Sequence, residues 1–506
     1  MRAEEMGAPV RRGADTLGNV LVLGLGKSAA AVADYCLGLL GSRVSGLFVA
    51  AGARTEASEE AAARIAARGA VVAFGDDGVD ALSREVPGGR FDLCVPSPGI
   101  APSTPLYSRG AALSDEIAGE VELAWRESAP ASRWIAITGT NGKTTVTSLT
   151  AHLLRAAGMD AVAVGNIGDT CLAAVAADPA RVFVAETSSY QLESTSRFAP
   201  DAAVLLNITP DHLKWHGSFE AYRDAKFKAL ANLDQAPGAV AVLDATDDEV
   251  RAKIRALKAQ PACERGFSYI PVGTKAGYAG DMRAACGADN AAFVDADGTL
   301  VVAAGGVEHR LVTTSELKIK GSHNVGNALA AAAAALALGA GDDAVACGLR
   351  SFAPLEHRIE PCGSIRGAAC YNDSKATNVD ASLKAIAAFP EARPIILLGG
   401  DDKGTDLAPL VEAAHRHARA VVCFGAAGQR FEDAFRAAAD EAPAGFETLR
   451  ASKLADALDA ACALAGAGDV ILLSPACASF DEFSCFEERG EVFKSLVAER
   501  AARLGA

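Results

Sequence analysis

The sequence predicts an α/β protein of three domains, each built on a largely parallel sheet covered by helices. Its 506 residues are enough for three or four domains that each bury a core. Short apolar runs alternate with longer Ala-rich stretches, as expected where helices connect parallel strands. Two apolar runs lead directly into Gly-rich turns, at 24–29 and 139–145. We place the domains at residues 1–130, 131–354 and 355–506.

The first domain is expected to have a Rossmann-like fold. An apolar run at Asn19–Leu23 leads into a Gly-rich turn and an Ala-rich helix, and a second run at Arg43–Ala50 follows at the spacing of a β-α-β unit. A third run, Phe91–Val95, ends in a Ser-Pro-Gly turn at 97–99. The segment Glu127–Ser132 contains Ser, Ala and Pro, and we expect it to be the linker to the second domain.

The central domain begins with the apolar strand Trp134–Thr138, which leads into the second Gly-rich loop. The Ala-rich run Ala328–Leu338 is expected to be a buried helix. For Gly273–Gly306, rich in Gly, Ala and Asp, we expect surface elaboration with short extended pieces. Further strands are expected at Val182–Ala185, Ala203–Asn207 and Val240–Leu243.

The third domain is expected to repeat the doubly wound pattern as a second Rossmann-like fold. It begins near Pro354, and helical stretches separate its apolar runs. No sequence repeat of solenoid length accompanies this similarity of architecture. Strands are expected at Cys370–Asn372, Pro394–Leu398, Ala420–Phe424 and Val470–Leu473.

Composition and charge exclude several classes of protein. The net charge of −15 argues against a nucleic-acid partner, which would require a basic face. The 12 Cys are scattered without a Cys-x-x-Cys pair, so zinc and thioredoxin-like motifs are unsupported. Met1–Leu17 has no apolar signal-peptide core, and Ala328–Leu338 is too short to span a bilayer. We therefore expect a cytoplasmic protein with reduced thiols and no membrane insertion.

The turn at 139–145 reads Gly-Thr-Asn-Gly-Lys-Thr-Thr and is the strongest local signal. Its glycines let backbone N–H groups approach phosphate oxygens, and the following helix N-terminus adds positive potential. A general Walker A motif would place Gly where this chain has Ile137, so this is a shortened phosphate loop. Lys143 can bind β- and γ-phosphates, and the Thr144 hydroxyl can bind Mg²⁺. The candidate ATP-binding residues are Gly139, Thr140, Asn141, Gly142, Lys143, Thr144 and Thr145.

The turn at 24–29 fits the weaker pattern Gly-x-Gly-x-x-Ala. A nicotinamide dinucleotide would require a carboxylate at the end of the second strand, where this chain has Ala50 and Ala51. A dinucleotide is therefore disfavoured. A different diphosphate on this helix N-terminus and a tight turn without a ligand both stay open.

Polar residues follow the strands of the central domain. Glu186 ends one apolar run, at the edge of the sheet where α/β proteins bind ligands. Glu186 and Thr144 offer the oxygen ligands that Mg²⁺ prefers. From residue type alone, His212 is more often structural than a metal ligand, and Lys226 resembles an ordinary surface lysine.

Three strand ends of the third domain carry Lys, Thr or Ser. Asn-Asp-Ser-Lys-Ala-Thr-Asn spans 372–378, Gly-Gly-Asp-Asp-Lys spans 399–403, and Ser-Pro-Ala-Cys-Ala-Ser spans 474–479. Such side chains can hold a carboxylate or a phosphate. Loop polarity is the alternative for each alone, but together they point to an anion site.

Taken in order from about Asn19 to Phe493, these motifs resemble the Mur ligase family, and within it the type that adds D-glutamate. The phosphate loop, the Glu-Thr-Ser-Ser-Tyr-Gln-Leu-Glu run at 186–193, Asn207 with Asp211-His212, and His357-Arg358 match the family's ATP and metal framework. The 372–378 motif, Lys403 and the 474–479 motif carry the likeness to the D-glutamate-adding type.

The resemblance implies an ATP-dependent ligase of peptidoglycan synthesis. ATP would phosphorylate the carboxylate of UDP-N-acetylmuramoyl-L-alanine, and the amine of D-glutamate would attack the acyl phosphate. A monomer with two Mg²⁺ ions is expected. By the same likeness Lys226 is carbamylated and binds the second Mg²⁺ with Glu186 and His212, and Thr144 and Glu186 bind the first. The catalytic set is then Lys143, Glu186, His212 and Lys226.

The remaining site residues follow from matching motifs. Nucleotide contacts are implied for Asn324, Asn327, Arg358, Asp373 and Lys375. The D-glutamate pocket would contain Thr377, Lys403, Ser474 and Phe480. The UDP-linked substrate would contact Gly26, Lys27, Ser28, Ser97 and Gly99, and its peptide end would contact Asn166 and Ser188.

Two alternatives remain open. Folylpolyglutamate synthetases and the enzyme that adds the third amino acid share the central motif, although Lys403, Ser474 and the lack of an Asp-Asn-Pro-Arg motif argue against them. A P-loop ATPase or nucleotide sensor is the second alternative. It would bind or hydrolyse ATP without a UDP-linked substrate.

Overall fold

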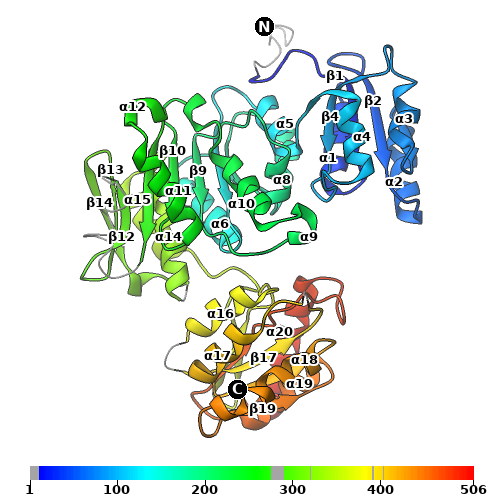
Figure 1. The fold of residues 1–506 in the computed structure, drawn as a ribbon. Coiled ribbons are helices and arrows are strands. Elements are labelled where there is room, and N and C mark those ends of the chain that lie inside the picture. The colour runs from blue at the N-terminus through cyan, green and yellow to red at the C-terminus, as the bar shows by residue number, and fades with distance from the viewer. Residues whose placement is uncertain (1–10, 275–289, 320, 390–391, 403, 506) are drawn as a thin grey trace. The chain divides into compact units, whose positions relative to one another are not determined.

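The computed structural model describes residues 11–274, 290–319, 321–389, 392–402 and 404–505. These residues form three sheets (Figure 1), and the α/β fold class is confirmed. The chain divides into two compact units. One contains the chain up to Glu316 together with Gly326–Arg350, and the other contains Leu317–Val325 and the chain from Ser351 onward. Each predicted segment holds one sheet, and the first two segments share a unit.

The first sheet has the strand order β3-β2-β1-β4-β5, with every pair parallel. This is the doubly wound strand order of a Rossmann-like fold, as predicted. Val20 and Val22 pack into the core on one face, and Leu21 and Leu23 pack on the other. Its elements are β1 (Gly18–Leu23), α1 (Lys27–Leu37), β2 (Val44–Ala51), α2 (Glu56–Ala66), β3 (Val71–Phe74), α3 (Gly78–Ser83), β4 (Phe91–Pro96), α4 (Pro105–Ala112) and β5 (Ser114–Ile117).

The connection between the first two sheets, where a linker was expected at Glu127–Ser132, is packed into the protein. Helix α5 (Glu120–Glu127) precedes it, and Ser128 and Ser132 are buried. Arg12 donates to the hydroxyls of both serines, at 2.9 and 2.8 Å. Glu127 can be buried because its carboxylate pairs with Arg43. The polar residues that made this segment look like a linker are hydrogen-bonded inside the protein.

The second sheet has the order β14-β13-β12-β11-β10-β9-β6-β8-β7 over the part of the chain that the structure describes. Neighbouring strands are parallel along β7-β8-β6-β9-β10-β11-β12. The pairs β12–β13 and β13–β14 are antiparallel. The elements are β6 (Arg133–Thr138), α6 (Lys143–Ala156), β7 (Ala161–Gly165), α7 (Cys171–Ala177), β8 (Val182–Glu186), α8 (Ser189–Glu193), β9 (Ala202–Leu205), α9 (Leu213–His216), α10 (Phe219–Phe227), β10 (Val240–Asp244), α11 (Asp248–Ala259), α12 (Ala262–Arg265), β11 (Ser268–Gly273), β12 (Ala291–Val294), β13 (Thr299–Ala304), β14 (Val307–Thr313), α14 (Ser322–Ala337) and α15 (Asp342–Ser351).

The described part of Gly273–Gly306 corrects the expectation of surface elaboration. Strands β12 and β13 extend the central sheet, and Ala291, Leu300 and Val301 are fully buried. Residues 275–289 of this stretch lie outside the described residues. The Ala-rich run, by contrast, is the buried helix that was predicted, since α14 is buried from Asn327 to Ala335.

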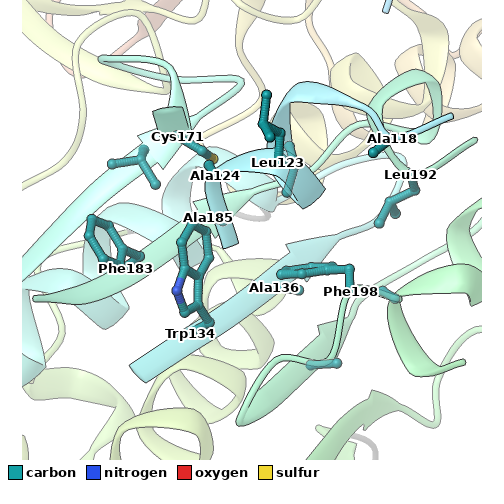
Figure 2. Close-up of a cluster of buried hydrophobic side chains, with 14 of the residues drawn as sticks. Ala118, Leu123, Ala124, Trp134, Ala136, Cys171, Phe183, Ala185, Leu192 and Phe198 are labelled. Atoms are coloured by element: carbon teal, nitrogen blue, oxygen red, sulfur yellow. The ribbon is translucent and has the colours of Figure 1, made fainter. Parts of the chain in front are cut away.

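Trp134 anchors the core beside the central sheet (Figure 2). Its ring stacks on Phe183 of β8 with centroids 4.7 Å apart and meets Phe198 edge-on at 6.0 Å. The indole N–H donates to the Ser128 hydroxyl at 3.0 Å, so the polar atom of this buried ring is paired. Strand β6, which leads into the phosphate loop, is therefore held firmly at its start.

The third sheet has the order β15-β16-β20-β17-β18-β19 within the described ranges, with only the β15–β16 pair antiparallel. No helix among the described residues is long and apolar enough to cross a membrane. The elements of this sheet are β15 (Glu360–Ile365), β16 (Ala368–Asn372), α16 (Val379–Ala387), β17 (Ile395–Gly399), α17 (Ala408–His417), β18 (Ala420–Phe424), α18 (Gly428–Ala437), β19 (Glu447–Arg450), α19 (Leu454–Leu464), β20 (Val470–Leu473) and α20 (Phe486–Leu504).

Candidate functional site

The loops after β1 and β4 meet where the strand order of the first sheet reverses, which is where such sheets bind ligands. The Ser97 N–H donates to the Leu23 carbonyl at 2.9 Å. The Ser97 hydroxyl is buried and has no hydrogen-bond partner among the described residues. Gly26 caps α1 without a side chain, and nothing lies within 4 Å of a Cβ built on Gly26 or Gly99. This edge therefore offers free backbone and an unused hydroxyl to a ligand.

Lys27 and Ser28 lie in the first turn of α1, where Lys27 is exposed and Ser28 is half-buried. The Lys27 ammonium donates to the carbonyl of Gly168 at 2.6 Å. Gly168 belongs to the loop between β7 and α7, so this bond joins the first sheet to the second.

The phosphate loop at 139–145 connects β6 to α6 with an unusual backbone. Gly139 has φ 155° and Gly142 has φ 88°, and a Cβ at Gly142 would lie 2.7 Å from Asn327 Oδ1 of α14. Asn207, after β9, accepts from the Asn141 N–H at 2.8 Å and donates to the Asn141 carbonyl at 3.0 Å. The Thr140 hydroxyl lies 2.8 Å from the Tyr222 hydroxyl. Glycine is required at these turns, and neighbouring side chains hold the loop in shape.

Two lysines converge on a single carbonyl oxygen of this loop. Lys143 and Lys226 each donate from Nζ to Gly139 O at 2.8 Å. Lys226 is 2% exposed, which corrects its interpretation as a surface lysine. Burial, and then the charge of Lys143, lower the pKa of Lys226 well below its ordinary value. A neutral amine, which can act as a nucleophile, is favoured at this position.

Glu186 ends β8 as a buried carboxylate with one free oxygen. Its Oε1 accepts from Asn166 Nδ2 at 2.8 Å, while Oε2 is buried and has no hydrogen-bond partner in the described structure. Buried polar atoms are normally paired, so an unpaired carboxylate oxygen suits a cation. Thr144 is half-buried in the first turn of α6, and Thr145 is buried. Ser188 caps α8 by accepting from the Gln191 N–H at 3.2 Å.

His212 precedes the short helix α9, and its ring meets that of Tyr222 edge-on with centroids 6.3 Å apart. Its side chain is 42% exposed, its φ is 56°, and its Nε2 lies 3.6 Å from Asp211 Oδ2. The ring packs on Tyr190 with centroids 4.8 Å apart. Burial and the charges of His212 and Lys226 lower the pKa of the neighbouring His216 to about 4. His216 is therefore neutral at physiological pH.

In the second unit, Asp373 and Ser474 meet at the carboxyl ends of β16 and β20. The Ser474 hydroxyl donates to Asp373 Oδ2 at 2.8 Å, and the Ile359 N–H donates to Oδ1 at 3.2 Å. Ser474 is fully buried, so its hydroxyl faces Asp373 and not solvent. Burial raises the pKa of Asp373 to about 7, although the Ser474 bond and Arg358 oppose the shift.

Arg489 of α20 joins the loops that follow these strands. It is 1% exposed and donates to Ser374 Oγ at 2.9 Å, Ser374 O at 2.8 Å, and the carbonyls of Cys477 and Ala478, both at 3.1 Å. Burial lowers its pKa to about 10, so it stays charged. One buried cation thus holds two of the three loops in which the anion-binding residues were predicted.

The remaining predicted residues lie at the same edge of the third sheet or near α14. Lys375 Nζ lies 3.5 Å from the centroid of the Phe486 ring, and the Thr377 N–H donates to the Lys375 carbonyl at 2.9 Å. Phe480 is 71% exposed, unusual for an aromatic side chain. Asn324 and Asn327 lie on α14, and Arg358 precedes β15. Lys403 lies outside the described residues.

Glu356, His357 and Glu491 form a further group of possible metal ligands, with ligand atoms within 4.8 Å of one another. Lys494 lies 3.7 Å from the Glu356 carboxylate and 2.7 Å from that of Glu491. Both carboxylates are exposed and share this one ammonium with Glu360, so this group is an ordinary surface network.

Sequence reasoning missed several residues that shape the site. Tyr222 supports the phosphate loop, Arg489 holds two loops of the third sheet, and Glu120 lies buried beside the loop after β7. All three lie in helices and reach the site only through tertiary contacts. The sequence pattern gives no signal for such contacts.

Comparison with known proteins agrees with this geometry. Residues 137–335 match the family model of the Mur ligase middle domain, and residues 357–477 match that of the Mur ligase, glutamate ligase domain. The UDP-N-acetylmuramoylalanine–D-glutamate ligase of Bordetella parapertussis is 36% identical, over 96% of this chain and 97% of the relative. The enzyme of the same name from Thermobifida fusca is 36% identical over 94% and 97%.

Solved structures share the fold at lower identity. The UDP-N-acetylmuramate-alanine ligase of Thermotoga maritima aligns with a TM-score of 0.53 and 18% identity, over 96% of this chain and 99% of that one. MurF of Acinetobacter baumannii aligns with a TM-score of 0.55 and 17% identity, over 90% of each chain.

Proposed function

The chain belongs to the Mur ligase family, and from this we propose that it joins D-glutamate to UDP-N-acetylmuramoyl-L-alanine in peptidoglycan precursor synthesis. ATP drives the reaction and becomes ADP and phosphate. Near full-length relatives with this activity in their names support the substrates. The observation that carries the chemistry is the phosphate loop with buried Lys226 and Glu186 beside it.

The reaction has two steps. A carboxylate oxygen of the alanyl group attacks the γ-phosphorus of ATP, ADP leaves, and an acyl phosphate forms. The amine of D-glutamate then attacks the acyl carbon, inorganic phosphate leaves with its bonding electrons, and the amine loses a proton as the amide forms. Lys143 and the loop N–H groups bind the phosphates and offset the repulsion between anionic reactants. Phosphorylation is required because a free carboxylate is a poor acyl donor.

Glu186 and Thr144 fit a Mg²⁺ ion at the ATP phosphates, and the buried, unpaired Oε2 of Glu186 supports this assignment. Bound there, Mg²⁺ would neutralise phosphate charge during transfer. A second Mg²⁺ is assigned to Glu186, His212 and a carbamylated Lys226. Exposed His212 is the least buried of these ligands.

Carbamylation of Lys226 is chemically consistent with its surroundings. The neutral amine attacks the carbon of CO₂, an N–C bond forms, and one proton leaves, which converts the side chain into an anionic carbamate. This step requires an unprotonated amine, which burial and Lys143 favour by lowering the pKa of Lys226.

The substrate contacts are assigned by loop. Gly26, Lys27, Ser28, Ser97 and Gly99 hold the UDP part, and Asn166 and Ser188 face the peptide end. In the second unit, Thr377, Lys403, Ser474 and Phe480 form the D-glutamate pocket. Because Ser474 is fully buried, its role is to position Asp373 and its own loop. Asn324, Asn327, Arg358, Asp373 and Lys375 contact the nucleotide.

These assignments describe a monomeric cytoplasmic enzyme without a nucleic-acid partner. The substrates are small molecules, and the chain's charge of −15 would repel nucleic acid.

Phosphate release in the presence of an amino-acid panel tests the proposal. With ATP, Mg²⁺ and UDP-N-acetylmuramoyl-L-alanine, D-glutamate should trigger release, and L-glutamate and meso-diaminopimelate should not. Release with another amino acid alone would overturn the substrate assignment. Release of phosphate from ATP without the UDP-linked substrate would instead indicate an ATPase.

A further inference from the structure

Glu120 is a buried carboxylate at the place where α1, α5 and α7 pack together, and no step of the reaction above uses it. It is the first residue of α5 and is 2% exposed. Its Oε1 accepts from the backbone N–H of Leu172, in the first turn of α7, at 2.6 Å. This bond fixes the end of the loop that connects β7 to α7.

That loop, residues 166–170, touches both halves of the proposed site. Asn166 Nδ2 donates to Glu186 Oε1 at 2.8 Å, and the Gly168 carbonyl accepts from Lys27 Nζ at 2.6 Å. A shift of α7 would therefore move a partner of the proposed metal ligand and a partner of the proposed UDP-binding lysine together.

Capping of α7 does not by itself explain why a carboxylate is buried at position 120. Thr170 already caps this helix, since its hydroxyl accepts from the Ala173 N–H at 3.3 Å. Glu120 Oε2 is buried and has no hydrogen-bond partner among the described residues. Burial raises the pKa of Glu120 to about 7, although the Leu172 bond and the charge of Lys27 oppose the shift. The Leu172 bond ties α7 to α5, and the loop that ends at α7 carries the carbonyl partner of Lys27.

We propose that Glu120 is a positioning residue for the UDP-linked substrate, which holds the 166–170 loop in place and with it the Gly168 carbonyl that accepts from Lys27. The inference rests on the proposed function, because the loop and Lys27 matter only if that substrate binds there. Glu120 acts through these residues and does not touch the reacting atoms.

Glu122 provides a matched control on the same helix. Its side chain is fully buried, and its carboxylate accepts from the backbone N–H groups of Ser196 and Arg197 and pairs with Arg126. It caps a loop that carries no predicted site residue. Glu122→Gln therefore removes a comparable buried charge away from the substrate.

The experiment compares Glu120→Ala, Glu120→Gln and Glu122→Gln by steady-state kinetics in each substrate, alongside thermal midpoints. Glu120→Ala should raise KM for UDP-N-acetylmuramoyl-L-alanine about tenfold and leave KM for D-glutamate within about twofold. Glu120→Gln, which keeps an acceptor but loses the charge, should give a smaller rise in the same KM. Glu122→Gln should lower the midpoint with all KM values within about twofold.

A double variant tests the route through Lys27. Lys27→Met combined with Glu120→Gln should bind the UDP-linked substrate no worse than Lys27→Met alone. The inference would be overturned if the Glu120 variants had the same KM values as Glu122→Gln. It would also be overturned if their KM for D-glutamate rose as much as their KM for the UDP-linked substrate. If Glu120→Ala does not fold, Glu120→Gln decides. Wild-type protein inactive with this substrate would refute the proposed function instead.

Discussion

At the scale of single residues, the two lysines on the Gly139 carbonyl explain how a cationic side chain can become a metal ligand. Lys143 and Lys226 both donate to this oxygen at 2.8 Å, and only Lys226 is fully buried. Desolvation and a neighbouring cation both disfavour its protonated form. Lys226, which looks like an ordinary surface lysine in the sequence, is buried against the phosphate loop and has a strongly lowered pKa.

Lys226→Ala should therefore abolish phosphate release, by at least about 1000-fold, because the anionic ligand is lost. Added bicarbonate should not restore activity, and a small carboxylic acid that occupies the space should restore part of it. Lys253→Ala is the control, since Lys253 of α11 packs over the Phe227 ring and has no predicted role in the reaction, so this variant should retain activity. Near-normal turnover of Lys226→Ala would exclude the carbamate.

Glu186→Gln should separate activity from stability. The substitution removes a buried charge whose Oε2 has no hydrogen-bond partner in the described residues, so we expect a gain of about 1 kcal/mol in unfolding free energy. Phosphate release should fall at least about 100-fold, and Mg²⁺ with ADP should no longer raise the thermal midpoint. Full activity, or an unchanged Mg²⁺ effect on the midpoint, would contradict the proposed metal site.

Glu120→Gln should also change how stability depends on pH. Burial raises the pKa of Glu120 to about 7, and Lys27 and Cys171 are the titratable groups beside it. The folded protein holds this proton after the unfolded chain has released it, so wild-type stability falls as pH rises from about 4.5 to 7. The variant lacks this loss. Its advantage in unfolding free energy should grow by about 3 kcal/mol between pH 4.5 and 8, measured by urea titration. A constant difference would contradict the shift.

At the scale of helices and strands, most buried strands were predictable, β12 and β13 were not, and the edge strands β3 and β5 were not. Runs such as Val182–Ala185 and Val470–Leu473 are continuous and apolar because both faces of a parallel sheet are covered. Strand β3 and strand β5, Ser-Asp-Glu-Ile, lie at sheet edges and are half-exposed. The composition of β5 carries no strand pattern, since only the neighbouring strand imposes its conformation, whereas β3 is a short run of strand-forming residues.

Helix α20 holds loops of the third sheet through Arg489, and substitution of Arg489 measures how much this contributes to stability and to D-glutamate binding. Arg489→Ala should lower unfolding free energy on the order of 3 kcal/mol, because it leaves the buried carbonyls of Ser374 and Cys477 unpaired and removes one of two donors to the Ala478 carbonyl. KM for D-glutamate should rise and KM for the UDP-linked substrate should stay unchanged. Arg489→Lys keeps the charge but not the forked geometry, and should fall between wild type and Arg489→Ala. Equal changes in both KM values would argue against a local effect.

At the scale of the whole molecule, motif order predicted the chemistry better than it predicted the construction of the site. The phosphate loop and Glu186 were recognisable because their chemistry requires particular residue types after a strand. The packed connection at Ser128 and Ser132, and the supporting roles of Tyr222 and Glu120, depend on contacts between distant segments. The domain boundaries and the individual substrate contacts stay predictions.

The transfer of an oxygen label tests the central claim most directly. UDP-N-acetylmuramoyl-L-alanine labelled with ¹⁸O at both carboxylate oxygens is incubated with ATP, Mg²⁺ and D-glutamate. The masses of the products are then measured by mass spectrometry. The account predicts the D-glutamyl amide with one ¹⁸O retained and one ¹⁸O in each inorganic phosphate released. Unlabelled phosphate, or no amide product, would contradict it.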